Sequence, residues 1–280
     1  MKKILQDIIV TLFGALASLL TAGILYVVEE QLEFSFYSLM LLFIIPVGAI
    51  LSGFVAAGGY YVGARLFGHK PGKLLLFNMV AVSIGTFFII YYLSYLFTQV
   101  EGVSISKLVP FTTYMDTILQ HQSIQFSVHG ADVGGTGELG LWGYATAALQ
   151  ILGFAIGGFF VYAILAALPY CDKCQKYLKQ KAKQVRYTSD TDGLAGLIET
   201  MQGEFAAGTM QQAVDTHARF GAAQHQQKEQ LQSTLTHKCC PGCAINWLEF
   251  TVYKLGNSEW EALNEYKLAG FSAAPLKLAD

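Results

Sequence analysis

Four long apolar runs constrain this chain more than any other feature. They cover residues 7–28, 38–64, 74–98 and 139–168. As helices, all four are long enough to cross the hydrocarbon of a bilayer, which takes about 20 residues. Hydrophobic residues make up 53% of the 280 residues and charged residues only 14%, a balance typical of membrane proteins. The sequence therefore predicts an all-α four-helix transmembrane bundle over residues 1–169.

Basic residues near the ends of these runs indicate the orientation of the bundle, because cytoplasmic loops retain Lys and Arg. They gather before the first run, between the second and third, and after the fourth: Lys2, Lys3, Arg65, Lys70, Lys73, Lys173, Lys176, Lys179, Lys181, Lys183 and Arg186. We therefore expect a multi-pass protein of a bacterial-type inner (plasma) membrane with both termini in the cytoplasm.

The connection between the third and fourth runs, residues 99–138, is predicted to be an external loop. Its length exceeds that of a simple connector. Within it, residues 111–126 have apolar side chains at near-helical spacing. This spacing predicts a helix that lies on the membrane surface or packs over the bundle.

Two C-x-x-C pairs follow the last apolar run. Cys171 and Cys174 come directly after it, and Cys240 and Cys243 lie much further along the chain. Each tight turn directs two thiolates at one ion, and four thiolates complete the tetrahedral site that zinc prefers. The sequence predicts one structural zinc ion per chain, bound by these four residues. The fifth cysteine, Cys239, is expected to be a small buried residue or a spare thiol.

Residues 170–280 have the composition of a soluble domain. Apolar spacing predicts an αα-hairpin over residues 190–222, and three segments with strand-like alternation follow. The second cysteine pair falls between the first two strands, as in a zinc ribbon, although the two pairs of a ribbon are usually only about 15 to 20 residues apart. We therefore predict a small cytoplasmic α+β zinc-ribbon-like domain, a three-stranded antiparallel meander with the helical hairpin as an insertion.

Small residues recur at four-residue spacing in the second and fourth apolar runs. Because small side chains let helix backbones approach closely in lipid, these positions predict packing contacts within one chain or between copies in a homo-oligomer. The positions are Gly48, Ser52, Ala56, Gly59, Gly63, Gly153 and Gly157.

The pattern favours a non-enzymatic role. Apart from Asp7, the apolar runs contain no Asp, Glu, Lys, Arg or His, which argues against an ion-coupled transporter. A net charge of −2 disfavours nucleic acid as a partner. Besides membrane lipid, we expect a cytoplasmic protein partner, bound by an oligomeric scaffold or sensor whose zinc-stabilised domain couples it to the bundle. Candidate contact residues are Trp247, Tyr253 and Trp260.

Two alternatives remain open. One is a passive channel or pore-type effector gated by the cytoplasmic domain. The other comes from the four-helix bundle with C-x-x-C pairs, which resembles the disulfide-generating quinone oxidoreductases and so implies a membrane thiol-redox enzyme. Those enzymes work on the oxidising side of the membrane, whereas Cys171, Cys174, Cys240 and Cys243 are predicted to be cytoplasmic.

Overall fold

The computed structural model describes residues 2–32, 34–41, 44–128, 131–225, 229–256, 259–272 and 274–276. The chain divides into two compact units, Met1–Ala167 and Leu168–Asp280. The first unit contains four long apolar helices, and the second contains an antiparallel sheet, two helices and a cluster of cysteines. The predicted order of a four-helix apolar bundle followed by a sheet-plus-helix domain is thus confirmed.

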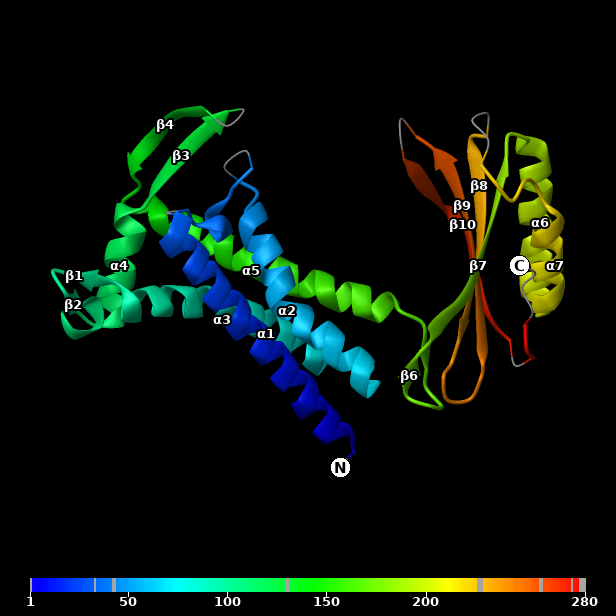
Figure 1. Ribbon diagram of the computed structural model, residues 1–280, viewed down its shortest axis with the longest axis horizontal. Coiled ribbons are helices and arrows are strands. Elements are labelled where there is room, and N and C mark those ends of the chain that lie inside the picture. The colour runs from blue at the N-terminus through cyan, green and yellow to red at the C-terminus, as the bar shows by residue number, and fades with distance from the viewer. Residues whose placement is uncertain are drawn as a thin grey trace. The chain divides into compact units, whose positions relative to one another are not determined.

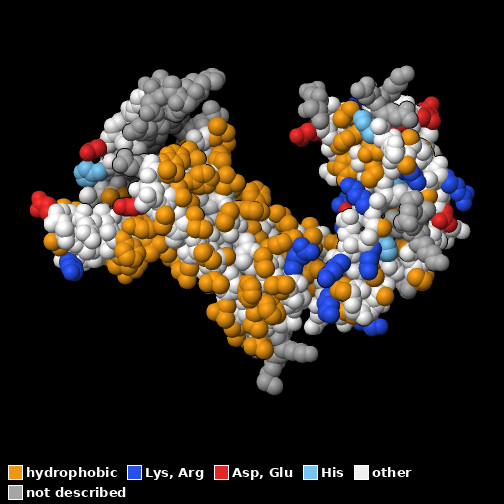
Figure 2. Space-filling model, in the orientation of Figure 1, with side chains coloured by type: hydrophobic (Ala, Val, Ile, Leu, Met, Phe, Trp, Pro, Cys, Tyr) orange, Lys and Arg blue, Asp and Glu red, His pale blue; other side chains and the backbone are white. Residues whose placement is uncertain are grey.

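Four helices form the bundle of the first unit, and each is long and apolar enough to cross a membrane. They are α1 (Lys2–Leu32), α2 (Val47–Phe67), α3 (Lys73–Phe97) and α5 (Trp142–Ala167), as Figure 1 shows. α2 and α3 each pack against both α1 and α5. Phe87, Ile90 and Phe154 are almost fully buried in the core of the bundle. Apolar side chains also cover much of the outer surface (Figure 2), which fits a lipid environment.

The second helix begins later than predicted, at Val47 instead of near residue 38. Pro46 precedes Val47. Proline has no backbone N–H and a fixed φ, so it is tolerated at a helix start and disfavoured inside a helix. The residues before it include a 3₁₀ turn, η1 (Phe36–Ser38), which lies against α2.

Much of the predicted external loop is regular secondary structure. Its elements are β1 (Gln99–Val100), β2 (Val103–Ser104), η2 (Ile105–Lys107), α4 (Phe111–His121), β3 (Ser123–Val128) and β4 (Ala131–Glu138). The predicted helix over 111–126 therefore ends at His121, and a hairpin strand follows it. Tyr114 and Leu119 of α4 are buried, and Phe111 packs against the core of the bundle. The helix thus packs against the bundle, and its position at a membrane surface stays a prediction.

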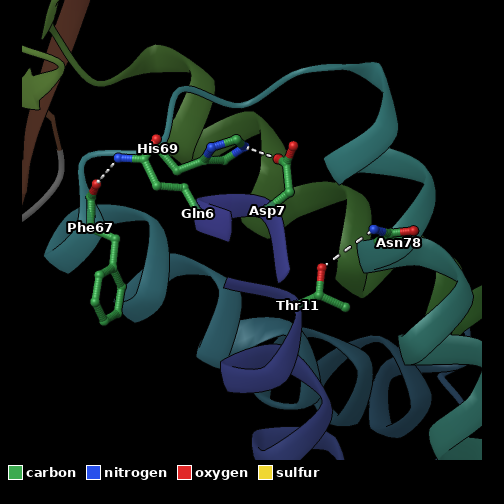
Figure 3. Close-up of polar contacts among 6 residues, drawn as sticks. All are labelled: Gln6, Asp7, Thr11, Phe67, His69 and Asn78. Carbon is green, nitrogen blue, oxygen red and sulfur yellow. Dashed lines mark hydrogen bonds and ion pairs between the residues drawn. The ribbon is translucent and has the colours of Figure 1, made fainter. Parts of the chain in front are cut away.

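Polar contacts join the start of α1 to the connection between α2 and α3 (Figure 3). Asp7 forms an ion pair with His69, with 2.9 Å between Oδ1 and Nε2. The amide of Gln6 donates a hydrogen bond to the backbone carbonyl of Phe67 at 3.1 Å. The side chain of His69 is only 6% exposed, and a polar group buried to that extent needs a partner, which the carboxylate of Asp7 supplies.

The second unit contains a four-stranded antiparallel sheet in the order β10-β9-β8-β7, with a separate two-stranded hairpin of β5 and β6. Its elements are β5 (Tyr170–Cys171), β6 (Lys176–Tyr177), β7 (Lys179–Thr188), α6 (Thr191–Ala207), α7 (Met210–Arg219), β8 (Leu231–Cys239), β9 (Asn246–Leu255) and β10 (Trp260–Ser272). α6 and α7 lie on one face of the sheet (Figure 1). The core between these helices and the sheet includes Met201, Leu235 and Phe250.

The predicted three-stranded antiparallel meander is present as β8, β9 and β10, but β7 adds a fourth strand that was not predicted. β7 pairs with β8 along most of its length. Side chains of β7 alternate between the two faces of the sheet, and Ala182, Gln184 and Arg186 lie on the face that the helices cover. This set is not the run of large apolar side chains that is typical of a core strand. Gln184 is buried, and its side chain is hydrogen-bonded to His217 of α7. The hydrophobic alternation that predicts strands is therefore missing from β7.

Candidate metal centre

The first cysteine pair lies in the hairpin formed by β5 and β6. Cys171 ends β5 and is paired with Lys176 of β6, and Cys174 lies in the turn between them. Gln175 adopts a φ of 53°, a left-handed conformation that closes this turn. The hairpin thus holds two thiols on the same side of a single tight turn.

The second pair lies in the turn between β8 and β9. The backbone N–H of Cys240 donates to the carbonyl of Ile245 at 2.9 Å, and the N–H of Ala244 donates to the carbonyl of Cys240 at 3.1 Å. The N–H of Gly242 donates to the sulfur of Cys240 at 3.4 Å. A Cβ added to Gly242 would lie 2.8 Å from the sulfur of Cys174. Glycine at this position therefore allows the two cysteine pairs to meet.

The sheet brings the two turns together from distant parts of the sequence. Lys179, the first residue of β7, pairs with Cys239, the last residue of β8. The β5–β6 hairpin immediately precedes β7, and the β8–β9 turn immediately follows β8. Both turns consequently lie at the same end of the sheet.

The four sulfur atoms of Cys171, Cys174, Cys240 and Cys243 all lie within 4.8 Å of one another. The sulfurs of Cys171 and Cys243 are 3.5 Å apart. Four sulfurs about 2.3 Å from one central ion would lie about 3.8 Å from each other, so the observed spacing is close to that of a tetrahedral tetrathiolate site. The residues present can hold a metal ion.

The cluster is enclosed on one side and open on the other. Cys171 and Cys240 are 5% and 1% exposed, whereas Cys174 and Cys243 are half-buried. Leu178, Ile245 and Trp247 pack around the cysteines. The apolar contacts fix the positions of the thiols, and the half-buried pair leaves a path by which an ion can enter.

Hydrogen bonds within the cluster shift the pKa values of its thiols. The backbone of Ile245 and the thiol of Cys174 lower the pKa of Cys243 to about 7. The contact with Cys243 raises the pKa of Cys174 to about 12, and burial raises the pKa of Cys171. Of Cys171, Cys174 and Cys243, the last gives up its proton most readily, and metal binding is expected to release protons from the cluster.

Two residues close to the second cysteine pair, Cys239 and His237, stay outside this cluster. Cys239 contacts the carbonyl of Cys240 through its sulfur, at 3.6 Å. His237 is 7% exposed, and its Nε2 is hydrogen-bonded to the side-chain oxygen of Asn246 at 2.8 Å. Among the described residues, the candidate metal cluster consists of Cys171, Cys174, Cys240 and Cys243 and includes neither Cys239 nor His237.

Most of the small residues singled out in the apolar runs lie where helices approach closely. A Cβ on Gly157 would lie 2.3 Å from the backbone oxygen of Ile50, and one on Gly153 would lie 2.8 Å from the Cβ of Ala49. Further members of the set, Ser52, Ala56 and Gly63, are buried, while Gly48 contacts η1 and Gly59 contacts α1. These contacts are within one chain, so the prediction of contacts between copies stays a prediction.

Trp247, Tyr253 and Trp260 lie on the face of the sheet opposite α6 and α7. Side chains alternate along β9, so Trp247 and Tyr253 point to the face away from the buried Leu248. Trp260 pairs with Leu255, which lies on the same face as Trp247 and Tyr253. Trp247 packs edge-on against Phe271, with ring centroids 4.4 Å apart. Trp260 packs edge-on against His225, and its ring is tilted by 51° relative to the ring of Tyr187. All three residues are partly buried.

Sequence reasoning missed a second polar site, in the membrane unit. α1 continues past residue 28, where the predicted apolar run ends, and Glu29 lines a cavity together with three tyrosines. The sequence does place an acidic residue and two hydroxyl side chains, Glu29, Ser35 and Tyr37, close together after the first apolar run. Only the fold adds the residues of α3 and α4.

Compared with protein-family models, with curated proteins and with solved structures, the chain matches none of them.

Proposed function

We propose that this protein is a membrane-embedded scaffold or sensor whose C-terminal unit contains one structural zinc ion and binds a protein partner. The observation that carries the proposal is the group of four cysteine sulfurs within 4.8 Å of one another. Because the chain itself supplies all four ligands, a bound ion has no open coordination position for a substrate. A closed site of this kind is structural and favours a binding module over an enzyme.

Zinc is the metal that fits the ligands best. Four thiolates select zinc or an iron centre over magnesium or calcium, which prefer oxygen ligands. Zinc has no redox chemistry, and the cysteines are expected on the reducing side of the membrane. The same position makes the thiol-redox alternative less favourable, because such enzymes need a disulfide that persists.

The ion would also connect the sheet to the membrane helix that precedes it. Cys171 follows Ala167, the last residue of α5, by only a few residues. With the ion bound, this short segment is attached to the β8–β9 turn as well as to β7. A change in the C-terminal unit would then reach α5 through a short connection, which is what a scaffold or sensor requires.

The face of the sheet opposite α6 and α7 is the surface we assign to the partner. It carries Trp247, Tyr253 and Trp260, and next to them Phe271 is 51% exposed. Aromatic residues are enriched where proteins bind one another.

The metal assignment is tested by elemental analysis of the full-length protein and two cysteine variants. The wild type should carry about one zinc per chain, since structural zinc stays bound through purification. Cys240→Ser removes a buried ligand and should lose the metal. Cys239→Ser changes the adjacent cysteine, which lies outside the cluster, and should keep it. A wild type with less than about half a zinc per chain, or with stoichiometric iron, contradicts the proposal.

The scaffold role is tested by cross-linking on the same three proteins in cells. A partner cross-linked to the C-terminal unit should be recovered with the wild type and with Cys239→Ser, and lost with Cys240→Ser. Recovery of the same partner with the metal-free variant would separate partner binding from the metal and refute the coupled role.

A further inference from the structure

A polar cavity of about 260 Å³ lies in the membrane unit, near the C-terminal end of α1. Its wall contains the carboxylate of Glu29 and the rings of Tyr37, Tyr91 and Tyr114, and Ile118 and His121 of α4 are exposed lining residues. Pockets for drug-sized ligands usually measure about 300–1,000 Å³. This cavity suits a smaller molecule or a single head group.

Glu29 gives the cavity a negative charge. The hydroxyl of Ser35 donates a hydrogen bond to its carboxylate, and the hydroxyl of Tyr37 lies 3.4 Å from both carboxylate oxygens. These donors are neutral. Among the described residues that line the cavity there is no Lys or Arg. A partly buried carboxylate without a cation is electrostatically incomplete, so the cavity favours a positively charged ligand.

The three tyrosines add a second attraction for a cation. Tyr37, Tyr91 and Tyr114 are 3%, 5% and 7% exposed. The rings of Tyr37 and Tyr91 are arranged edge to face, with centroids 6.0 Å apart. The face of an aromatic ring attracts a cation, and several such rings together recognise alkylammonium groups.

An independent observation comes from Gln150 of α5, which is fully buried. Its amide nitrogen donates to the hydroxyl of Ser38, a lining residue of the cavity, at 3.2 Å. Its carbonyl oxygen has no hydrogen-bond partner among the described residues. Buried acceptors are nearly always paired in folded proteins. This acceptor adds negative potential beside the cavity and favours a ligand that donates hydrogen bonds or carries positive charge.

We propose that this cavity binds the ammonium group of a small organic cation. One carboxylate and several tyrosine rings suit an alkylammonium ion of the size of choline or ethanolamine. A calcium or magnesium ion would require more than the one carboxylate on the wall, and an anion would face Glu29 with no Lys or Arg among the described lining residues. The ammonium group could belong to a free small molecule or to a lipid head group. This site lies in the membrane unit and does not depend on the proposed role of the metal-binding unit.

The test uses the full-length protein in nanodiscs of phosphatidylglycerol, a lipid without an ammonium group. Isothermal titration with choline and with ethanolamine should give saturable binding. The neutral tert-butyl analogue of choline, in which carbon replaces nitrogen, should bind at least about tenfold more weakly, because it lacks the charge. No saturable binding of either cation, or equal binding of the neutral analogue, overturns the proposal.

Variants at two adjacent acidic residues connect the binding to the cavity. Glu29→Gln removes the charge with little change in size and should weaken choline binding at least about tenfold, since a charge-assisted contact is lost. Glu29→Asp keeps the charge and should retain most of the affinity. Glu30→Gln is the matched control, because Glu30 is exposed and does not line the cavity. Unchanged binding by Glu29→Gln, or equal losses in Glu29→Gln and Glu30→Gln, refutes the site.

Nanodiscs that contain phosphatidylethanolamine then identify the source of the ammonium group. Weaker apparent binding of choline in these discs supports the proposal with a lipid head group as the competing ligand. Unchanged binding supports it with a free cation as the ligand.

Discussion

Gly157 of α5 and Gly53 of α2 allow these two helices to approach within backbone contact. A Cβ on Gly157 would lie 2.3 Å from the oxygen of Ile50, and one on Gly53 would lie 2.4 Å from the oxygen of Phe154. Any larger side chain forces the helices apart. Because lipid provides no hydrophobic force that holds helices together, close packing of this kind is a main source of stability in a membrane bundle.

The first prediction concerns this contact. Gly157→Ala should destabilise the bundle by about 1–3 kcal/mol, because the added methyl group has no space. Gly58→Ala in α2 is the control, since a Cβ there meets nothing within 4 Å. Its stability should be unchanged or raised by up to about 1 kcal/mol through the better helix propensity of alanine. Unfolding in mixed micelles with increasing SDS measures both. Similar stability of the two variants would show that the α2–α5 contact is not tight.

At the scale of residues, the sequence predicts what depends on local spacing. The four clustered cysteines are identifiable because C-x-x-C specifies a turn, and the structure brings all four together. The contact of Gly242 with Cys174 is not identifiable, because it joins two turns that meet only in the folded sheet. The same holds for Glu29, whose tyrosine neighbours come from three separate elements.

At the scale of elements, α7 is attached to the sheet by a buried histidine. His217 is fully buried, with Nδ1 at 2.7 Å from the side-chain oxygen of Gln184 in β7 and Nε2 at 3.0 Å from the hydroxyl of Ser233 in β8. Burial, together with the nearby charge of Arg186, lowers the pKa of His217 to about 4. The ring is therefore neutral in the folded protein at neutral pH.

This burial makes the second unit sensitive to acid. The ordinary pKa of histidine is about 6.5, so between about pH 6.5 and 4 the unfolded chain binds a proton that the folded chain does not. Stability should thus be fully present above about pH 6.5 and should fall by up to roughly 3 kcal/mol as the pH approaches 4. Chemical unfolding at a series of pH values measures this slope.

His217→Gln should flatten the pH dependence, even if the variant is less stable overall. His225→Gln, at an exposed histidine, should leave the slope unchanged. If His217→Gln retains the wild-type slope, another group causes it.

Two elements show where sequence patterns were insufficient. β7 lacks apolar alternation, and its buried inward residue Gln184 pairs with the polar side chain of His217 in α7, so only tertiary contacts identify it as a strand. α2 is shorter than its apolar run because Pro46 limits its start, while hydropathy alone treats proline as an ordinary part of the run. The αα-hairpin was predictable, since both helices show apolar periodicity and Gly208 adopts a left-handed φ of 73° between them.

At the scale of the whole molecule, the division into two units follows directly from the change in composition after α5, and it was predictable for that reason. The units have separate cores, one aromatic and apolar between membrane helices and one between a sheet and two helices. Their stabilities should therefore respond to different treatments.

A chelator tests this independence. Removal of the metal should increase hydrogen–deuterium exchange in the second unit, most strongly at the β5–β6 hairpin and the β8–β9 turn, because these segments lose their common ligand. Exchange in α1, α2 and α3, which the ion does not connect to the sheet, should stay unchanged. The same treatment of Cys240→Ser, which should already lack the metal, is the control and should have no further effect. An equal increase throughout the bundle would show that the two units unfold together.

The separation of the two cysteine pairs also imposes an order on biosynthesis. Cys171 and Cys243 are 72 residues apart, and at about 5–20 residues per second a ribosome needs roughly four to fourteen seconds to make the chain between them. All four apolar helices precede Cys171 and leave the ribosome first. The four apolar helices are therefore complete while the nascent chain still carries only half of the ligands of the proposed metal site.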